Sequence, residues 1–296
     1  MKYQWNPANL IINESGRIYH LDLNGDEIGN IIFLVGDPER VEHVSKYFDK
    51  IEVKRSKREF LTHTGMLGKH RVSVLSTGIS TANIDIAINE LDAIANINLH
   101  SREPLDVFRQ LTFIRLGTSG SINPSIEVDT ILASRWAVGF DGLLLMYQQS
   151  ESLSDDFFRL DKALKNWFHL KGLSFPIYLS QASEELINLF SKKYLTGMTA
   201  TMHGFYAPQS RELRLKGRYP DFIKILNEFE HQDITFSNME MESSAIYGLS
   251  SLLGHRALSF NAIIANRTTG RFSESPYQTV EKMISEVLED VRNLDL

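Results

Sequence analysis

The stretch IIFLVGDPERVEHVSKYF, residues 31–48, decides the fold class of this chain. Its first five residues are apolar and mostly branched, which is typical of a short strand buried on both faces. Gly36 ends the apolar run, Asp37 can cap a helix, and Pro38 suits the first helical turn. Residues 31–35 are therefore expected to form a buried strand and residues 37–48 the helix that follows it. A buried strand that leads directly into a helix is the repeating unit of an α/β fold.

The same alternation of short apolar runs and amphipathic stretches continues along the chain. Further buried strands are expected at 71–77, 111–118, 130–134 and 257–265, and helices at 82–94, at 238–254 and over the last twenty residues. Gly254 is well suited to the C-cap of its helix. The alternation predicts a largely parallel sheet with helices on both faces, in which ligands bind at the carboxyl ends of the strands.

Composition narrows the class of protein. The chain has 296 residues, 43% hydrophobic and 23% charged, with no linker-like tract, which favours one large domain. A net charge of -6 argues against a general nucleic-acid binder but allows a local basic pocket. The absence of cysteine excludes disulfides and thiolate metal sites. No signal-peptide segment and no apolar run of about 18 residues is present, so we expect a soluble, cytoplasmic protein without membrane contact.

Two strand exits carry a positive charge. Gly36 lets the backbone approach a ligand closely, and Arg40 lies in the first turn of the next helix. Together these features favour the binding of an anion. A plain helix cap is the alternative. Arg115 lies inside a buried strand, directly before the polar turn GTSG at 117–120. A buried arginine needs an anion, which is either a ligand or an internal carboxylate.

Two further motifs are ambiguous when taken alone. Glu240 and Glu242 flank Met241 in the helix expected at 238–254, where they complement the helix dipole or receive a vicinal diol. GFYAPQSREL, residues 204–213, holds Gln209 and Arg211, which are ordinary loop residues or two planar groups aimed at one planar ligand.

Taken together, the motifs resemble the nucleoside phosphorylase-I family. Those that carry the resemblance are GDPERV, SKREF, STGIS, IRLGTSGSINPSIEVDTIL, FYAPQSR, NMEMES and ANRT, in that order. The similarity runs from about Tyr19 to the C-terminal helix. It implies a single three-layer α/β/α domain with a central mixed β-sheet over residues 19–296, after an N-terminal extension (1–18) and with an insertion at about 96–110. It also implies cleavage of a nucleoside by inorganic phosphate to ribose 1-phosphate and free base, with no metal in the chemistry.

The resemblance assigns roles to individual residues. The positions that match the family's phosphate site are Gly36, Arg40, Arg58, Arg115 and Thr118. Those that match its ribose site are Met241, Glu242 and Thr118, with Glu240 beside them. His20 matches a histidine that reaches the 5′-hydroxyl in a neighbouring subunit's site, although its spacing to Gly36 is slightly short. The resemblance thus implies a homo-oligomer, at least a dimer, with active sites shared across an interface.

The base site distinguishes branches of the family. Purine-selective members carry a Ser-Asp pair after a late strand, where this chain has Asn266 and Arg267. The uridine phosphorylase branch instead carries an aromatic residue followed by Gln-x-Arg. By that resemblance Phe205 stacks on uracil, Gln209 and Arg211 bind its edge, and Arg267 supports them. The implied substrates are uridine and phosphate, and the implied catalytic residues are Arg40, Arg58, Arg115, Gln209 and Arg211.

Several alternatives stay open. This chain has Ser80-Thr81-Ala82-Asn83 where bacterial relatives have Gly-Gly-Pro-Ser, and Asn83 also replaces a serine of a potassium site whose glutamate matches Glu59, so that ion is left open. The insertion and the longer N-terminus can convert the bacterial hexamer to a dimer. The competing functions are a phosphorylase of broader or purine specificity, a hydrolytic nucleosidase, and a non-enzymatic nucleoside-binding regulator. Three arginines around a water argue against the hydrolase.

Overall fold

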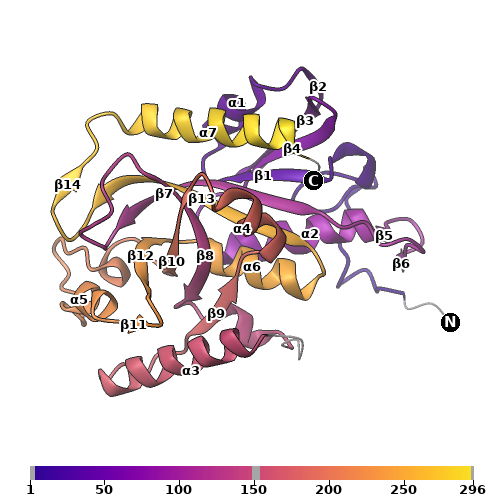
Figure 1. Ribbon diagram of the computed structural model, residues 1–296. Coiled ribbons are helices and arrows are strands. Elements are labelled where there is room, and N and C mark those ends of the chain that lie inside the picture. Colours follow the sequence, from indigo (N-terminus) through magenta and orange to yellow (C-terminus); the bar gives the residue numbers. More distant parts are fainter. Residues whose placement is uncertain (1–3, 149–153, 295–296) are drawn as a thin grey trace.

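The computed structural model describes residues 4–148 and 154–294, most of which form a large mixed sheet covered by helices (Figure 1). In spatial order, the main path of the sheet is β11 (Glu230–His231), β12 (Ile234–Glu240), β10 (Leu195–Thr201), β8 (Ile131–Gly139), β13 (Arg256–Asn266), β7 (Thr112–Ser121), β1 (Ile31–Val35), β4 (His70–Ser76), β3 (Phe60–Leu67) and β2 (Lys50–Lys57). Two short strands lie beside this path, β14 (Arg271–Phe272) on β13 and β9 (Tyr178–Gln181) on β8. The expected buried strand at 31–35 is confirmed, and all five of its residues are buried.

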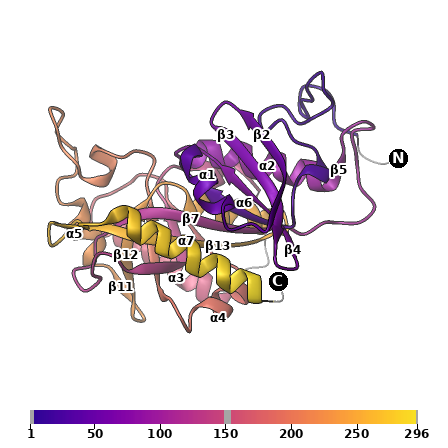
Figure 2. The ribbon, with the colours of Figure 1, turned by 90° about the horizontal axis from the view of Figure 1, so that it is seen from above.

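The helices are α1 (Pro38–Ser45), α2 (Thr81–Asn96), α3 (Asp155–Leu170), α4 (Glu184–Phe190), α5 (Phe222–Asn227), α6 (Ser243–Leu252) and α7 (Pro276–Asn293). Helices α1 and α7 lie on one face of the sheet, and α2 and α6 on the opposite face (Figure 1). Seen from above, α7 runs across β7 and β13 (Figure 2). The expected mixed sheet with helices on both faces is confirmed. The expectation of a largely parallel sheet is wrong, because β3 pairs antiparallel with β2 and β4, and β8 pairs antiparallel with β13.

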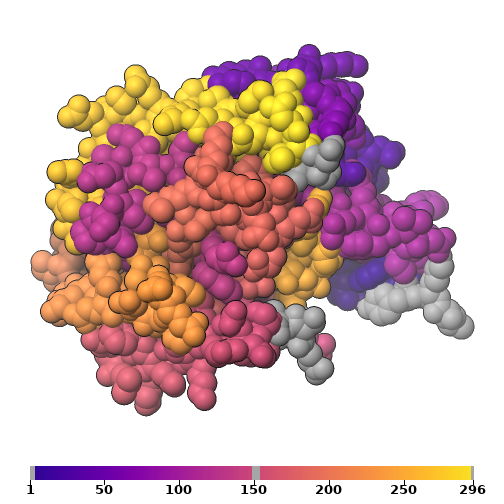
Figure 3. All heavy atoms as spheres, viewed as in Figure 1, coloured from indigo at the N-terminus to yellow at the C-terminus, as the bar shows by residue number. Residues whose placement is uncertain are grey.

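Helix α7 packs on the sheet through apolar side chains. Met283, Ile284, Val287, Leu288 and Val291 are all buried, at the spacing of one helical face. Each fully buried side chain of this size contributes about 1.5–3 kcal/mol. The space-filling view shows the C-terminal helix against the N-terminal part of the chain (Figure 3). The C-terminal helix therefore packs against β7, β13 and α1.

One strand pairing closes part of the sheet into a ring. β12 is parallel to β10 on one side and also pairs antiparallel with β7, through Asn238 with Ser121 and Met239 with Gly120. Strands β12, β10, β8, β13 and β7 therefore form a closed ring. The ring brings the end of β12 against the end of β7, two segments more than 110 residues apart in sequence.

The expected start of the helix at 238–254 is wrong. Residues 238–240 are not helical: they end β12, and α6 begins only at Ser243. Pairing with β10 and β7 holds them extended, and Glu242 occupies the N-cap position. The helix does end where expected, with Gly254 at a φ of +79°.

The segment at 96–110, where the sequence predicts an insertion, has strands of its own. It contains a separate two-stranded sheet of β5 (Ile97–Asn98) and β6 (Glu103–Pro104). The backbone N–H of Trp5 donates to the carbonyl of Arg102 at 3.0 Å. The N-terminal residues and this insertion therefore pack against each other at one end of the molecule.

Candidate active site

A cavity of about 530 Å³ opens where β1, β7 and β12 end. It brings together most of the site residues predicted from the sequence. The predicted residues that line it are Gly36, Arg40, Arg115, Thr118, Phe205, Gln209, Arg211, Glu240, Met241 and Glu242. A second cavity of about 660 Å³ lies between α1 and α7 and shares Arg40, Thr118 and Phe272 with the first.

One end of the cavity offers a positive charge. Asp37 caps α1 by accepting from the backbone N–H of Glu39 at 2.9 Å, which sets Arg40 in the first turn. Arg40 has no ion pair within the described residues, and its Nη1 donates only to the carbonyl of Leu116, at 3.4 Å. Burial, and secondarily the charge of Arg115, lowers the pKa of Arg40 below its ordinary value. An anion bound here would relieve both effects.

Arg115 is buried against two carboxylates. Its Nη2 lies 2.6 Å from Glu242 Oε2 and 3.3 Å from Glu240 Oε2. Burial opposes its charge, but the two glutamates outweigh burial and raise the pKa of Arg115. The internal salt bridge that the sequence left open is therefore present. Since Arg115 also lines the cavity, it can contact a bound anion as well.

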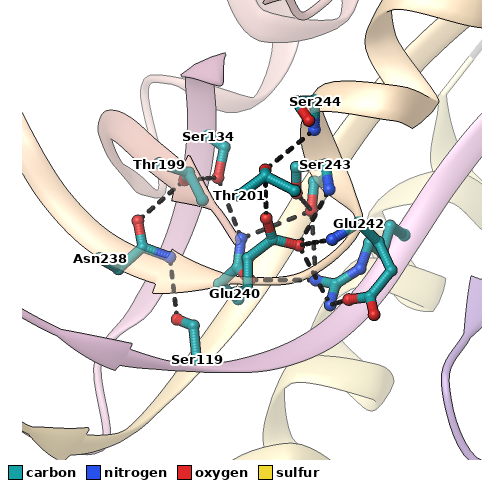
Figure 4. A network of polar contacts seen from close by, with 12 residues as sticks. Ser119, Ser134, Thr199, Thr201, Asn238, Glu240, Glu242, Ser243 and Ser244 are labelled. Atoms are coloured by element: carbon teal, nitrogen blue, oxygen red, sulfur yellow. Dashed lines mark hydrogen bonds and ion pairs between the residues drawn. The ribbon is translucent and has the colours of Figure 1, made fainter. Parts of the chain in front are cut away.

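The two glutamates have different surroundings. Both oxygens of Glu240 accept from the protein: one from Thr201 Oγ1 at 2.6 Å, the other from the backbone N–H groups of Glu242 and Ser243 at 2.9 Å each (Figure 4). Glu240 thus fixes the start of α6. Glu242 accepts from Arg115 and from the backbone N–H of Ser80, and burial raises its pKa, with Arg115 opposing that rise. Glu242 is the better placed of the two to receive hydroxyl groups from the cavity.

The opposite end of the cavity holds the predicted base-binding residues. Arg211 Nη1 donates to Gln209 Oε1 at 2.6 Å and to the carbonyl of Phe205 at 3.0 Å. Its guanidinium lies 3.9 Å from the centre of the Phe205 ring. Burial first, and Arg267 second, lower the pKa of Arg211 to about 10.

Arg267 supports this end from outside the cavity lining. It donates to the carbonyls of Gln209 at 3.1 Å and Ser210 at 3.2 Å. Ser210 follows with a φ of +54°, and in this loop Gln209 is buried while Phe205 is half exposed. The strand exit at β13 thus fixes the loop that carries Gln209 and Arg211.

Besides Arg267, two predicted site residues, Arg58 and His20, do not line the cavity of their own chain. Arg58 lies in the tight turn between β2 and β3, with a φ of +55° and its guanidinium 5.8 Å from the Tyr19 ring centre. The His20 ring lies 4.9 Å from the same ring, and its Nδ1 is 2.6 Å from Glu90 Oε1. Arg58 and His20 therefore gather around Tyr19. Within one chain Arg58 does not join Arg40 and Arg115.

Other lining residues were missed by sequence reasoning. Ile79, Ser119, Ile264 and Phe272 line the cavity. Apolar residues at strand exits carry no chemical signal, and Ser119 was read only as part of a polar turn. Glu59 and Asn83 both lie close to Gly78 on the cavity wall.

Within residues 4–148 and 154–294, no three His, Asp or Glu side chains gather as metal ligands would. Among those same residues, no helix combines the length and the apolar character that crossing a membrane requires.

Comparison with known proteins agrees with this geometry. Residues 30–294 match the model of the phosphorylase superfamily. The chain is 29% identical to a uridine phosphorylase of Thermococcus kodakarensis, over 95% of this chain and 89% of that one. It is 28% identical to a uridine phosphorylase of Escherichia coli, over 94% and 98%.

A solved structure is also similar. It is a Trypanosoma brucei nucleoside phosphorylase described as showing uridine phosphorylase activity, with a TM-score of 0.84 at 27% identity, over 95% of this chain and 98% of that one. The match to the superfamily model spans nearly the whole chain, including every strand of the closed ring. This protein therefore belongs to the phosphorylase superfamily.

Proposed function

We propose that this enzyme is a uridine phosphorylase, which reversibly cleaves uridine with inorganic phosphate to uracil and ribose 1-phosphate. The observation that carries the proposal is the order of groups along one cavity. Arg40, which has no carboxylate partner among residues 4–148 and 154–294, lies at one end, Met241 and Glu242 follow, and Gln209 with Arg211 lies at the other end. Phosphate, ribose and base fit this order. The names of the relatives support the same choice.

The Gln209 amide gives a reason for choosing uracil. Because Arg211 donates to Oε1 of Gln209, a flipped amide would set an NH₂ group against the guanidinium. Oε1 thus stays an acceptor with a second lone pair, and Nε2 stays a donor. Uracil offers an imide N–H beside a carbonyl, which matches this pair. Cytosine has an acceptor at the ring position of that N–H, so the proposal predicts that cytidine is rejected.

The cleavage step follows from the same residues. The bond between C1′ and the base nitrogen breaks, and its electron pair leaves with uracil. A phosphate oxygen held by Arg40 and Arg115 forms the new bond to C1′. Negative charge that develops on the uracil carbonyls is stabilised by Arg211, which gives that donor its greatest effect in the transition state. The uracil anion takes up a proton on release. Glu242 accepts from the ribose hydroxyls and holds the sugar in line.

Arg58 and His20 fit the proposal only through a second copy of the chain. Both lie around Tyr19 and not at the cavity of their own chain. We infer a homodimeric unit in which Arg58 of one copy adds a cation to the phosphate end of the other copy's cavity. His20 would reach the 5′-hydroxyl in the same way.

The function is tested by following ultraviolet absorbance with uridine, thymidine, cytidine and inosine, each with and without phosphate. The proposal predicts cleavage of uridine that requires phosphate, and no cleavage of cytidine. Equal rates without phosphate would identify a hydrolase, and preferred cleavage of inosine would contradict the uracil assignment.

A further inference from the structure

A line of buried polar side chains crosses the inside of the strand ring. It begins at Arg115, whose Nη1 donates to Asn261 Oδ1 at 3.1 Å. It continues through Ser134, Thr199 and Asn238 and ends at Ser119, which returns to β7 four residues after Arg115 (Figure 4). The four intermediate side chains are completely buried, so water cannot replace any link.

The direction of every hydrogen bond in this line is determined. Asn261 Nδ2 donates to Ser134 Oγ at 2.9 Å. Thr199 Oγ1 donates to Asn238 Oδ1 at 2.8 Å. Since a hydroxyl has one hydrogen, Thr199 must accept from Ser134, whose Oγ lies 2.5 Å away.

The Asn238 amide is oriented in turn. Its Oδ1 accepts from Thr199, so its Nδ2 faces Ser119 and donates to Ser119 Oγ at 2.9 Å. All the donors therefore point the same way, from the guanidinium of Arg115 toward Ser119. A line with one direction also strengthens its last donor, because each bond polarises the next.

The Ser119 hydroxyl is left with a hydrogen to give. Its oxygen accepts from Asn238, and the part of the chain that the structure describes offers no acceptor for its proton. Ser119 lines the cavity next to Gly120, which lies under the side chain of Arg267 at the base end. Two residues further on, Ser121 Oγ lies 3.0 Å from the carbonyl oxygens of both Asn123 and Ser237, which share its one proton, and it does not line the cavity. The two serines lie on the same strand, but only the hydroxyl proton of Ser121 has a protein acceptor among the described residues.

We propose that Ser119 is a catalytic hydrogen-bond donor to a carbonyl oxygen of the pyrimidine base, held in that role by the buried line from Arg115. The inference rests on the proposed function, since it assumes a uracil at this end of the cavity. Charge that builds on the carbonyl as the base leaves strengthens this bond in the transition state. Through this line of hydrogen bonds, the orientation of the Ser119 hydroxyl also depends on Arg115 at the phosphate end of the cavity.

The test compares Ser119→Ala with Ser121→Ala. Measured quantities are kcat/KM for uridine, KM for phosphate, and inhibition constants of uracil, pyrimidin-2-one and pyrimidin-4-one, each analogue lacking one uracil oxygen. Ser119→Ala is expected to lower kcat/KM roughly tenfold to a hundredfold. Ser119→Ala should weaken the binding of uracil and of the analogue that keeps the carbonyl oxygen to which Ser119 donates. The inhibition constant of the other analogue and the KM for phosphate should stay unchanged. Ser121→Ala should change none of these constants.

Thr199→Val provides a second variant that removes one hydroxyl without changing the side-chain shape. Thr199 lies outside the cavity lining, so an effect on the base constants must pass through Asn238 and Ser119. A smaller loss with the same pattern across the three bases supports the line. An unchanged kcat/KM in Ser119→Ala, equal weakening of all three bases, or a rise confined to KM for phosphate would overturn the proposal. If the wild-type enzyme does not cleave uridine with phosphate, the proposed function fails instead, before any variant is compared.

Discussion

Arg211 holds three parts of the candidate base site at once: the Gln209 amide, the Phe205 carbonyl and the face of the Phe205 ring. Replacing it with alanine removes the proposed donor to uracil and frees the Gln209 amide to flip. We expect kcat for uridine to fall by about a hundredfold or more. Arg214, exposed in the same loop, is the matched control, and Arg214→Ala should keep the wild-type rate. Wild-type kcat in Arg211→Ala would exclude Arg211 from base recognition.

Ser80, which contacts Glu242 through its backbone N–H, has an unusual backbone conformation. Its φ of +103° and ψ of 157° lie in a region that is almost restricted to glycine, while its N–H donates to Glu242 Oε1 at 2.9 Å. Ser80→Gly keeps this N–H and removes the strain, so the free energy of unfolding should rise by about 1 kcal/mol. Ser80→Ala keeps the strain and should bring no such gain. Chemical denaturation of the two variants measures the difference, and a less stable Ser80→Gly would show that the turn is unstrained.

Single residues were predictable where their chemistry is unusual for their position. An arginine inside a strand, as at Arg115, requires a buried anion, and the structure supplies Glu240 and Glu242. Ser119, Thr199 and Asn261 gave no such signal, because serine, threonine and asparagine are common in any sequence. Their role depends on which strands are neighbours.

At the scale of elements, strand β7 has room for Arg115 only because residue 117 is glycine. A Cβ at Gly117 would lie 1.9 Å from Arg115 Nη1 and 2.2 Å from Cζ. Gly117→Ala therefore forces the guanidinium away from the cavity wall. We expect KM for phosphate to rise by about tenfold or more, since a charged hydrogen bond is worth about 1.5–3 kcal/mol.

Gly217→Ala is the control for this change, because its added Cβ would meet only Glu212 Oε1, at 3.4 Å. Steady-state kinetics at varied phosphate compares the two variants. An unaltered KM for phosphate in Gly117→Ala would mean that Arg115 serves only the internal salt bridge.

Elements were predictable where pattern and boundary signals agree. The buried strand at 31–35 and the helix that ends at Gly254 each combine an apolar pattern with a residue that marks the boundary. The start of α6 was misplaced because residues 238–240 are extended only through their pairing with β10 and β7. Periodicity within one segment cannot reveal a partner strand that is far away in sequence, and so it also missed the closed ring.

At the scale of the whole molecule, the proposal requires two copies of the chain for each complete site. Mixing Arg58→Ala with Glu242→Ala subunits tests this requirement. In a hybrid dimer, the cavity with an intact Glu242 receives the intact Arg58 of the other copy. Random exchange should then restore about a quarter of the wild-type activity, since half the dimers are hybrids with one intact site each.

Glu242→Ala mixed with Arg115→Ala is the control, because both residues line the cavity of their own chain. In that mixture every cavity keeps one of the two substitutions, so subunit exchange should restore no activity. Recovery in neither mixture would mean that Arg58 does not act across an interface.

The central claim is that phosphate, rather than water, takes the ribosyl group from uracil. Phosphorus-31 NMR of the enzyme with uridine and inorganic phosphate measures this directly. The phosphate signal is expected to decline while a ribose 1-phosphate signal grows in step with the uracil released. Release of uracil with an unchanged phosphate signal would show that water is the acceptor instead.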